Sequence, residues 1–224
     1  MATVQTPPRN CLLLHDVDWK TYTQLLRAFA ERPAVRLTYD RGDLEIMSPL
    51  PEHEDVIYLL GRFIDTLTEE LGLPVKGGGS TTLRRRKKQR GLDPDKCYWI
   101  TNESKVRGKK RLNLRVDPPP DLALEVDVTR SSLDRMKIYA KLGVPEVWRL
   151  DDPQTLTFNV LGKDGKYAQA THSLAFPLVT PAELLNFLGL RGQMDHNAIV
   201  REFRNWIRQR LAGGGGAPPA AGSS

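Results

Sequence analysis

The sequence predicts a mixed α/β fold, in which a central mixed β-sheet is flanked by helices. Residues 118–150 are expected to form a strand, a helix and a second strand within about thirty positions, which is the typical length of a βαβ unit with parallel neighbouring strands. Residues 19–31 and 52–71 carry apolar side chains at helical spacing. Two further strand pairs are separated by short turns containing glycine, which is typical of β-hairpins.

The N-terminal third begins with an irregular stretch, residues 1–15. A helix is expected over residues 19–31, with Asp18 as its N-cap. Two strands follow, over residues 35–40 and 43–47, and the Arg-Gly pair between them predicts a compact hairpin. This part of the chain therefore supplies one helix and one hairpin to the fold.

The next segment begins with the second helix, residues 52–71, which Gly72 is well suited to end. Residues 75–83 are rich in glycine, but they match neither common nucleotide-binding glycine pattern, so they are weak evidence for a phosphate site. A turn and then a strand are expected over residues 91–101, with Asp95 placed just before the strand.

The strand over residues 122–128 contains the feature that points to chemistry. Its apolar positions alternate with polar ones, which predicts that one face lies in the core and that Glu125 and Asp127 share the other face. Two carboxylates at positions i and i+2 on a buried strand are costly unless a positive group lies between them. A divalent cation is a suitable partner, because hard cations prefer carboxylate oxygens.

After this strand, Ser131 and Asp134 resemble a capping box at the start of a helix that Gly143 ends. A second buried strand is expected over residues 145–150, and a hairpin with an Asp-Gly turn over residues 155–171. Helices are expected at residues 181–188 and 195–211, the second packing on the body of the protein. The predicted organisation is an irregular N-terminus (1–18), a core domain (19–171), a helical extension (172–211) and a disordered low-complexity tail (212–224).

Composition excludes several protein classes. The chain has 224 residues, 40% of them hydrophobic and 27% charged, as expected for a soluble globular protein. No apolar run is long enough to span a membrane, and no signal peptide is visible. The two cysteines, Cys11 and Cys97, lack metal-type spacing, so we expect reduced thiols and a cytoplasmic location.

The distribution of charge is more informative than the net charge of +6. Residues 84–90 and residues 105–115 each carry six basic side chains and no acid, so the rest of the chain is acidic overall. Such basic segments are either solvated loops or a surface that binds a polyanion, and both interpretations stay open on the sequence. If the polyanion is a nucleic acid, phosphate contacts are assigned to Arg84, Arg85, Arg86, Lys87, Lys88, Arg90, Lys109, Lys110 and Arg111.

Three acids form the candidate constellation: Asp95 before one strand, and Glu125 and Asp127 on another. With Pro94-Asp95 as the PD element and residues 125–127 as the (D/E)XK element, the pattern resembles the PD-(D/E)XK nuclease superfamily. That motif is short and degenerate, so it is weak evidence when taken alone.

A wider match is more specific. The blocks GDLEIMSPLPEHE, GLDPDKCYWI, PPPDLALEVDVT and SSLDRMKIYAKLGVPEVWRLD together resemble the Uma-two family of restriction-endonuclease-like proteins, over roughly residues 19–161. The resemblance implies a restriction-endonuclease-like core fold, a divalent metal, Mg²⁺ or Mn²⁺, and a DNA substrate. Cleavage of both strands of a duplex would favour a two-fold dimer.

The resemblance assigns roles by position. Asp95 and Glu125 match the acidic metal ligands, with Asp127, which stands at the position of the usual lysine, as a further ligand. A basic residue of the following helix takes the place of that lysine: Arg135, or failing that Lys137. Arginine cannot act as a general base, but it can bind phosphate or neutralise developing charge. In the second helix, Glu52 or His53 matches a first-helix contribution. Without the resemblance, His53 is better interpreted as an exposed histidine in the first turn of that helix.

Two other functions remain open on the sequence. The chain could be a nucleic-acid-binding module whose acids are structural. It could also be an interaction protein that docks an acidic partner through its basic segments, with Asp127 paired to Arg135. The binding module predicts that nucleic-acid binding survives Asp95→Asn and Glu125→Gln and that no cut product appears. The interaction protein predicts that stability does not depend on Mg²⁺.

Overall fold

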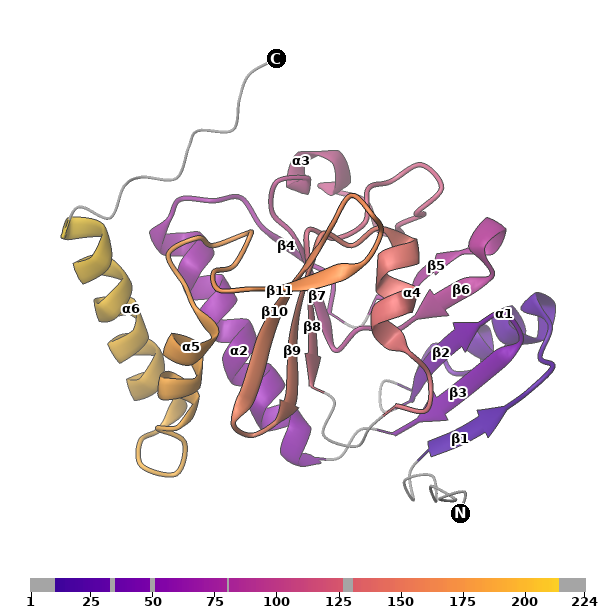
Figure 1. The fold of residues 1–224 in the computed structure, drawn as a ribbon, viewed down its shortest axis with the longest axis horizontal. Coiled ribbons are helices and arrows are strands. Elements are labelled where there is room, and N and C mark those ends of the chain that lie inside the picture. The colour runs from indigo at the N-terminus through magenta and orange to yellow at the C-terminus, as the bar shows by residue number, and fades with distance from the viewer. Residues whose placement is uncertain (1–10, 33–34, 49–50, 80, 127–130, 214–224) are drawn as a thin grey trace.

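The computed structural model describes residues 11–32, 35–48, 51–79, 81–126 and 131–213, which form a mixed α+β fold built on two sheets (Figure 1). This confirms the fold class that the sequence predicts. The larger sheet has six strands and the smaller sheet has five.

The larger sheet contains the predicted βαβ unit at its centre. Strands β8 (Leu122–Val126) and β9 (Glu146–Asp152) are parallel, and the helix α4 (Arg135–Leu142) connects them. In the register of this pair, Leu122 lies opposite Glu146 and Val126 opposite Leu150. All other pairs in this sheet are antiparallel. In spatial order, its strands are β11 (Tyr167–Ala170), β10 (Thr155–Leu161), β9 (Glu146–Asp152), β8 (Leu122–Val126), β7 (Lys96–Trp99) and β4 (Lys76–Gly77).

One face of this sheet is covered by three helices, α2 (Pro51–Glu70), α5 (Pro181–Leu188) and α6 (His196–Ala212) (Figure 1). Their apolar stripes meet Leu122, Leu124 and Trp148 of the sheet in one buried cluster. Helix α6 packs on α2, as predicted, and its Arg204 forms ion pairs with the two glutamates at the end of α2.

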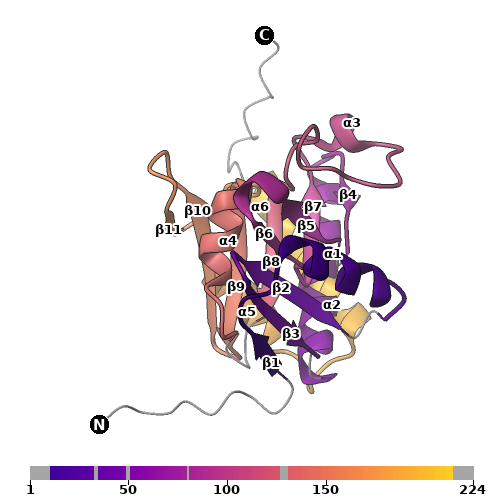
Figure 2. The ribbon, with the colours of Figure 1, turned by 90° about the vertical axis from the view of Figure 1, so that its right-hand side faces the viewer.

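The other face is covered by α4 (Arg135–Leu142) and by the smaller sheet. The smaller sheet runs β1 (Cys11–Leu14), β3 (Asp43–Met47), β2 (Arg36–Asp40), β6 (Arg90–Leu92) and β5 (Leu83–Arg85), all antiparallel. The helix α1 (Trp19–Ala28) packs on its outer face through Tyr22, which stacks on Tyr39 (Figure 2). Two short helices complete the fold, η1 (Arg86–Lys88) and α3 (Glu103–Val106).

Local sequence signals place many element ends correctly. Asp18 caps α1 by accepting a hydrogen bond from the Thr21 amide at 2.6 Å. Gly143 ends α4 in the left-handed conformation, with φ +84°, and Gly165 adopts φ +76° in the hairpin turn. The helix at residues 181–188 has the predicted bounds.

Three local expectations were wrong. Residues 11–14 are a strand rather than irregular chain, because they pair with β3. Ser131 and Asp134 form no capping box: Asp134 is itself the N-cap and accepts from the Lys137 amide at 2.9 Å, so α4 begins at residue 135. The loop interpretation of residues 84–90 was also wrong: they belong to the β5–β6 hairpin, with the 3₁₀ helix η1 (Arg86–Lys88) at its turn.

The strand β8 also differs from its prediction. Every residue from Leu122 to Val126 is buried, so the strand has no solvent face. Helices α2 and α4 cover opposite faces of the sheet at this point, and Glu125 therefore lies under α4. Crossover helices of βαβ units pack on the faces of a sheet, so the strands between them are buried on both sides.

Candidate active site

Glu125 is the centre of the candidate site. The residue is only 4% exposed, and α4 supplies its hydrogen-bond partners. Arg135 donates from Nε to Oε2 at 3.0 Å and from Nη2 to Oε1 at 2.6 Å, and the hydroxyl of Tyr139 also donates to Oε1. Arg135 and Tyr139 lie four positions apart on α4, so both point from one face of the helix to the strand below.

Arg135 also joins the two sheets. Its Nη1 donates to the hydroxyl of Thr38 on β2 at 2.6 Å, and its Nη2 donates to the carbonyl oxygen of Asp93 at 2.9 Å. The side chain is 7% exposed, and each of its three nitrogens donates to a protein acceptor. A buried guanidinium needs such partners, because an unpaired buried charge is strongly destabilising.

Asp95 meets the end of β8. Its Oδ2 accepts a hydrogen bond from the amide of Val126 at 2.8 Å, which places its carboxylate beside Glu125. Burial, and then the negative charge of Glu125, raise the pKa of Asp95 to about 7, although Arg135 acts in the opposite direction. The structure thus brings together two acids that are 30 positions apart in the sequence.

The family model of Uma2, described as "putative restriction endonuclease", matches residues 19–195, most of the chain. The chain belongs to the Uma2 family. No curated protein matches it. Within the described residues of this Uma2 chain, no helix is long and apolar enough to cross a membrane.

The remaining predicted residues of the Uma2 site do not all reach this centre. Lys137 is exposed and borders a surface hollow with Asp134 and Lys166, whereas Arg135, two positions earlier on α4, is buried against Glu125. The side chain of His53 and all of Asp127 lie outside the described residues, so their predicted roles stay predictions.

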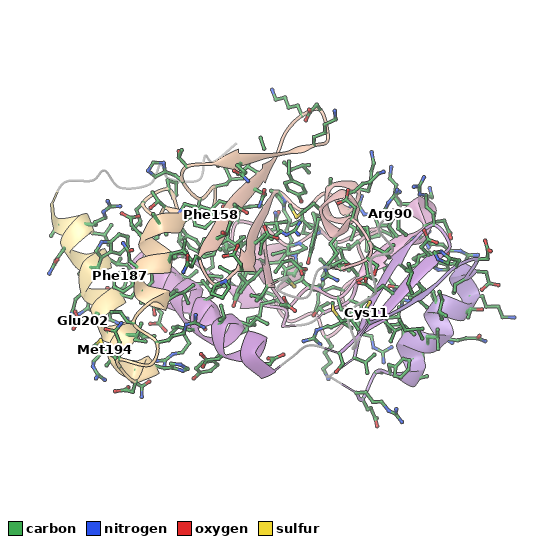
Figure 3. All side chains as sticks on the ribbon, turned by 60° about the horizontal axis from the view of Figure 1, so that its bottom comes forward. Cys11, Arg90, Phe158, Phe187, Met194 and Glu202 are labelled. Carbon is green, nitrogen blue, oxygen red and sulfur yellow. The ribbon has the colours of Figure 1, made fainter. Side chains whose placement is uncertain are left out.

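The predicted nucleic-acid residues divide into exposed and internal groups. Arg84, Arg86, Lys87, Lys88, Lys110 and Arg111 are exposed. Arg90 is 6% exposed and pairs with Asp40 at 3.0 Å, beside the strands of the smaller sheet (Figure 3), so it is a structural cation. Lys109 is exposed but already forms an ion pair with the buried Asp117, and Arg85 is half-buried.

Sequence reasoning missed three polar residues that build the site. Asp93, interpreted as a turn residue, is 6% exposed; its Oδ2 accepts from the Leu37 amide at 3.0 Å, and burial raises its pKa. Thr38 and Tyr139 bind Arg135 and Glu125 from separate elements. The only signal for Tyr139 was its i+4 spacing from Arg135.

Glu45 is a fourth missed residue. It is fully buried on β3 and accepts from the Ser131 hydroxyl at 2.7 Å and from the Ser132 amide at 2.5 Å. These bonds attach the segment before α4 to the smaller sheet. Glu45 therefore helps to set the position of α4, and with it the position of Arg135 over Glu125.

Asp95 and Glu125 are the described residues that fit a cation. Burial, and then the charge of Glu125, raise the pKa of Asp95, and a cation between the two carboxylates would remove their repulsion. Among the described residues, no group of three or more His, Cys, Asp or Glu side chains could hold a metal ion. A third ligand would come from outside the described residues, where Asp127 was expected to serve, or from substrate and water, as Mg²⁺ commonly accepts.

Proposed function

We propose that the chain is a metal-dependent endonuclease that hydrolyses phosphodiester bonds in DNA, with Asp95 and Glu125 as ligands of Mg²⁺ or Mn²⁺. The observation that supports it most is the contact of Asp95 with the end of β8, which sets two carboxylates side by side. In this position, burial and then the charge of Glu125 raise the pKa of Asp95 to about 7. Membership of a nuclease family supports the substrate class.

In this proposal, the bound metal would polarise the scissile phosphate and lower the pKa of a water molecule. The protein's own residues contribute by holding the two carboxylates in place. Arg135 and Tyr139 fix both oxygens of Glu125, and the Val126 amide fixes Asp95. A carboxylate has about four acceptor sites, so Glu125 keeps capacity for a cation beside these donors.

Arg135 takes a different role from the one that the resemblance implies. Its nitrogens already donate to Glu125, Thr38 and Asp93, and it is buried, so we assign it as a positioning residue and not as a phosphate ligand. No described basic residue of α4 other than Arg135 contacts Glu125.

A second candidate function is a non-catalytic nucleic-acid-binding or interaction module. The observation that favours it is the state of Glu125: Arg135 neutralises its charge in a bidentate pair, and the carboxylate borders a narrow hollow lined by Arg135, Met136 and Arg149. In that function the pair is a structural device that joins α4 to β8.

The test is incubation of the purified protein with supercoiled plasmid and Mn²⁺, beside Glu125→Gln, Asp95→Asn and Glu202→Gln. Glu202 is exposed on α6, at the far end of the molecule (Figure 3), so its variant makes the same chemical change away from the site. The proposal expects nicked or linear product from the wild type and Glu202→Gln only. Equal cleavage by all four proteins would indicate a contaminant, and no product from a folded wild type would favour the second function.

A further inference from the structure

A cavity of about 380 Å³ lies outside the candidate active site, between α1, the β5–β6 hairpin and residues 112–115. Its volume is in the range of pockets that bind small molecules or single nucleotide units. Four arginines line it: Arg27 from α1, Arg84 and Arg86 from the hairpin, and Arg115 from the second basic segment. Among the described residues that line the cavity, none is acidic.

The four arginines are exposed, and within the described residues none of them forms an ion pair. Other arginines of the chain do have such partners: Arg90 pairs with Asp40, and Arg204 with Glu69 and Glu70. Four like charges around one cavity repel each other, so an anion that enters it is stabilised. Guanidinium groups suit phosphate in particular, because their planar forks match its oxygens.

The cavity also contains an aromatic wall. Trp19 lines it and is partly exposed. The indole is held in place by edge contacts with Tyr22 and Tyr39, whose ring centroids lie 5.2 Å and 5.5 Å away. A fixed, partly exposed ring beside basic side chains is the arrangement on which nucleic-acid bases stack in single-strand-binding sites.

The cavity is connected to the candidate active site through its lining. Thr82 lines the cavity and its side chain interacts with the carboxylate of Asp93. The carbonyl oxygen of Asp93 accepts from Arg135, which holds Glu125. Three residues, Thr82, Asp93 and Arg135, therefore link the cavity to Glu125 of the acidic pair.

We propose that this cavity binds one nucleotide of a nucleic-acid strand, with its phosphate on Arg27, Arg84, Arg86 and Arg115 and its base against Trp19. The inference deepens the proposed function by locating where the strand is held, and it rests on that function only for the choice of a nucleic acid as the anion. Sequence reasoning found Arg84 and Arg86, but Arg27 and Trp19 enter the cavity only because α1 packs beside the hairpin.

The test is fluorescence anisotropy of a labelled twelve-nucleotide oligothymidylate with the full chain in EDTA, over a series of NaCl concentrations. The variants are Arg84→Gln/Arg86→Gln and Trp19→Phe. The matched control is Lys163→Gln/Arg201→Gln, which removes two exposed charges away from the cavity. We expect the arginine pair variant to bind at least tenfold more weakly, with a salt slope shallower by about 1.4, as for two lost contacts to a single strand.

The control should keep the wild-type affinity and slope, and Trp19→Phe should bind more weakly with an unchanged slope. Thermal melts establish that each variant is folded.

An equal loss of affinity in the control would mean that diffuse surface charge binds the oligonucleotide, and it would overturn the proposal. The proposal would also be overturned if adenosine monophosphate or inorganic phosphate, at the same concentration as the oligothymidylate, displaced it from the protein. That result would indicate a site for small anions. Because EDTA prevents metal-dependent cleavage, a failure of the plasmid test leaves this result unaffected.

Discussion

Arg135 of α4 holds Glu125 of β8 through two hydrogen bonds, from Nε to Oε2 at 3.0 Å and from Nη2 to Oε1 at 2.6 Å. Both side chains are nearly inaccessible to water, at 7% and 4% exposure. This pair links the helix, the central strand and, through Thr38, the smaller sheet. It is the structural basis of the candidate site, whichever function the site serves.

Replacing Arg135 should destabilise the fold. Arg135→Met leaves the Glu125 carboxylate buried without its cation, which typically costs about 3–5 kcal/mol. The double variant Arg135→Met/Glu125→Leu should recover most of that loss, because both buried charges are removed together. Urea unfolding measures both, with Arg201→Met as an exposed control. Equal stability of Arg135→Met and the control would contradict the structure.

Divalent cations should stabilise the protein through Asp95. Binding to the folded state adds about 2.7 kcal/mol when the ion is present at a hundred times its dissociation constant, so Mg²⁺ or Mn²⁺ should raise the melting temperature by several degrees. Asp95→Asn should abolish this rise, and Glu202→Gln should preserve it. A rise that survives in Asp95→Asn would place the ion elsewhere, and the absence of a rise in the wild type would count against the nuclease.

Without metal, Asp95 should make stability depend on pH. The folded protein keeps the proton of Asp95 up to about pH 7, whereas an aspartate in an unfolded chain has an ordinary pKa of 3.8, so folding takes up a proton between those pH values. Its contribution to the free energy of unfolding therefore falls as the pH rises from about 4 to 7, by an amount on the order of 2–4 kcal/mol. Urea unfolding in EDTA measures this dependence. Between pH 5 and 8, the free energy of unfolding should fall in the wild type relative to Asp95→Asn, which cannot ionise at this position. Parallel stability curves would show that Asp95 ionises normally.

Gly91 should not tolerate a larger side chain. A Cβ at this position of β6 would overlap the hydroxyl oxygen of the buried Tyr22 and press on the Cβ of Arg84 at 3.0 Å. Gly91→Ala should lower the free energy of unfolding by about 1–3 kcal/mol, the usual cost of overpacking. Gly77→Ala is the control, because its Cβ would come no closer than 3.9 Å to Tyr98. Denaturant midpoints that coincide for the two variants would contradict the packing of α1 on the smaller sheet.

Much of the fold could be predicted because its signals are local. Asp18, Gly143 and Gly165 mark a helix start, a helix end and a turn through backbone requirements of their own. The β5–β6 hairpin was missed because its sequence lacks the alternation of apolar and polar residues that indicates a strand. Its apolar residues are Leu83 and Leu92, which lie at its two ends. Its pairing is decided by the neighbouring strand β2, which lies about fifty positions earlier in the chain.

The candidate site could be predicted only in part, for a related reason. An Asp and a Glu at the right places indicate a pair of acids, but not their partners. Whether Arg135 meets a phosphate or a carboxylate depends on which face of α4 covers β8, and Thr38, Asp93 and Tyr139 complete its surroundings from three different elements.

The sequence by itself determined the mixed α/β architecture, the βαβ unit and the two acids of the site, because hydrophobic periodicity, caps and turns act over a few neighbouring residues. The tertiary structure alone decided that Glu125 is neutralised by Arg135, that Arg90 is internal, and that Arg27 joins Arg84, Arg86 and Arg115 around one cavity. Burial and charge pairing depend on residues that are distant along the chain, and these become neighbours only when the two sheets pack around α4.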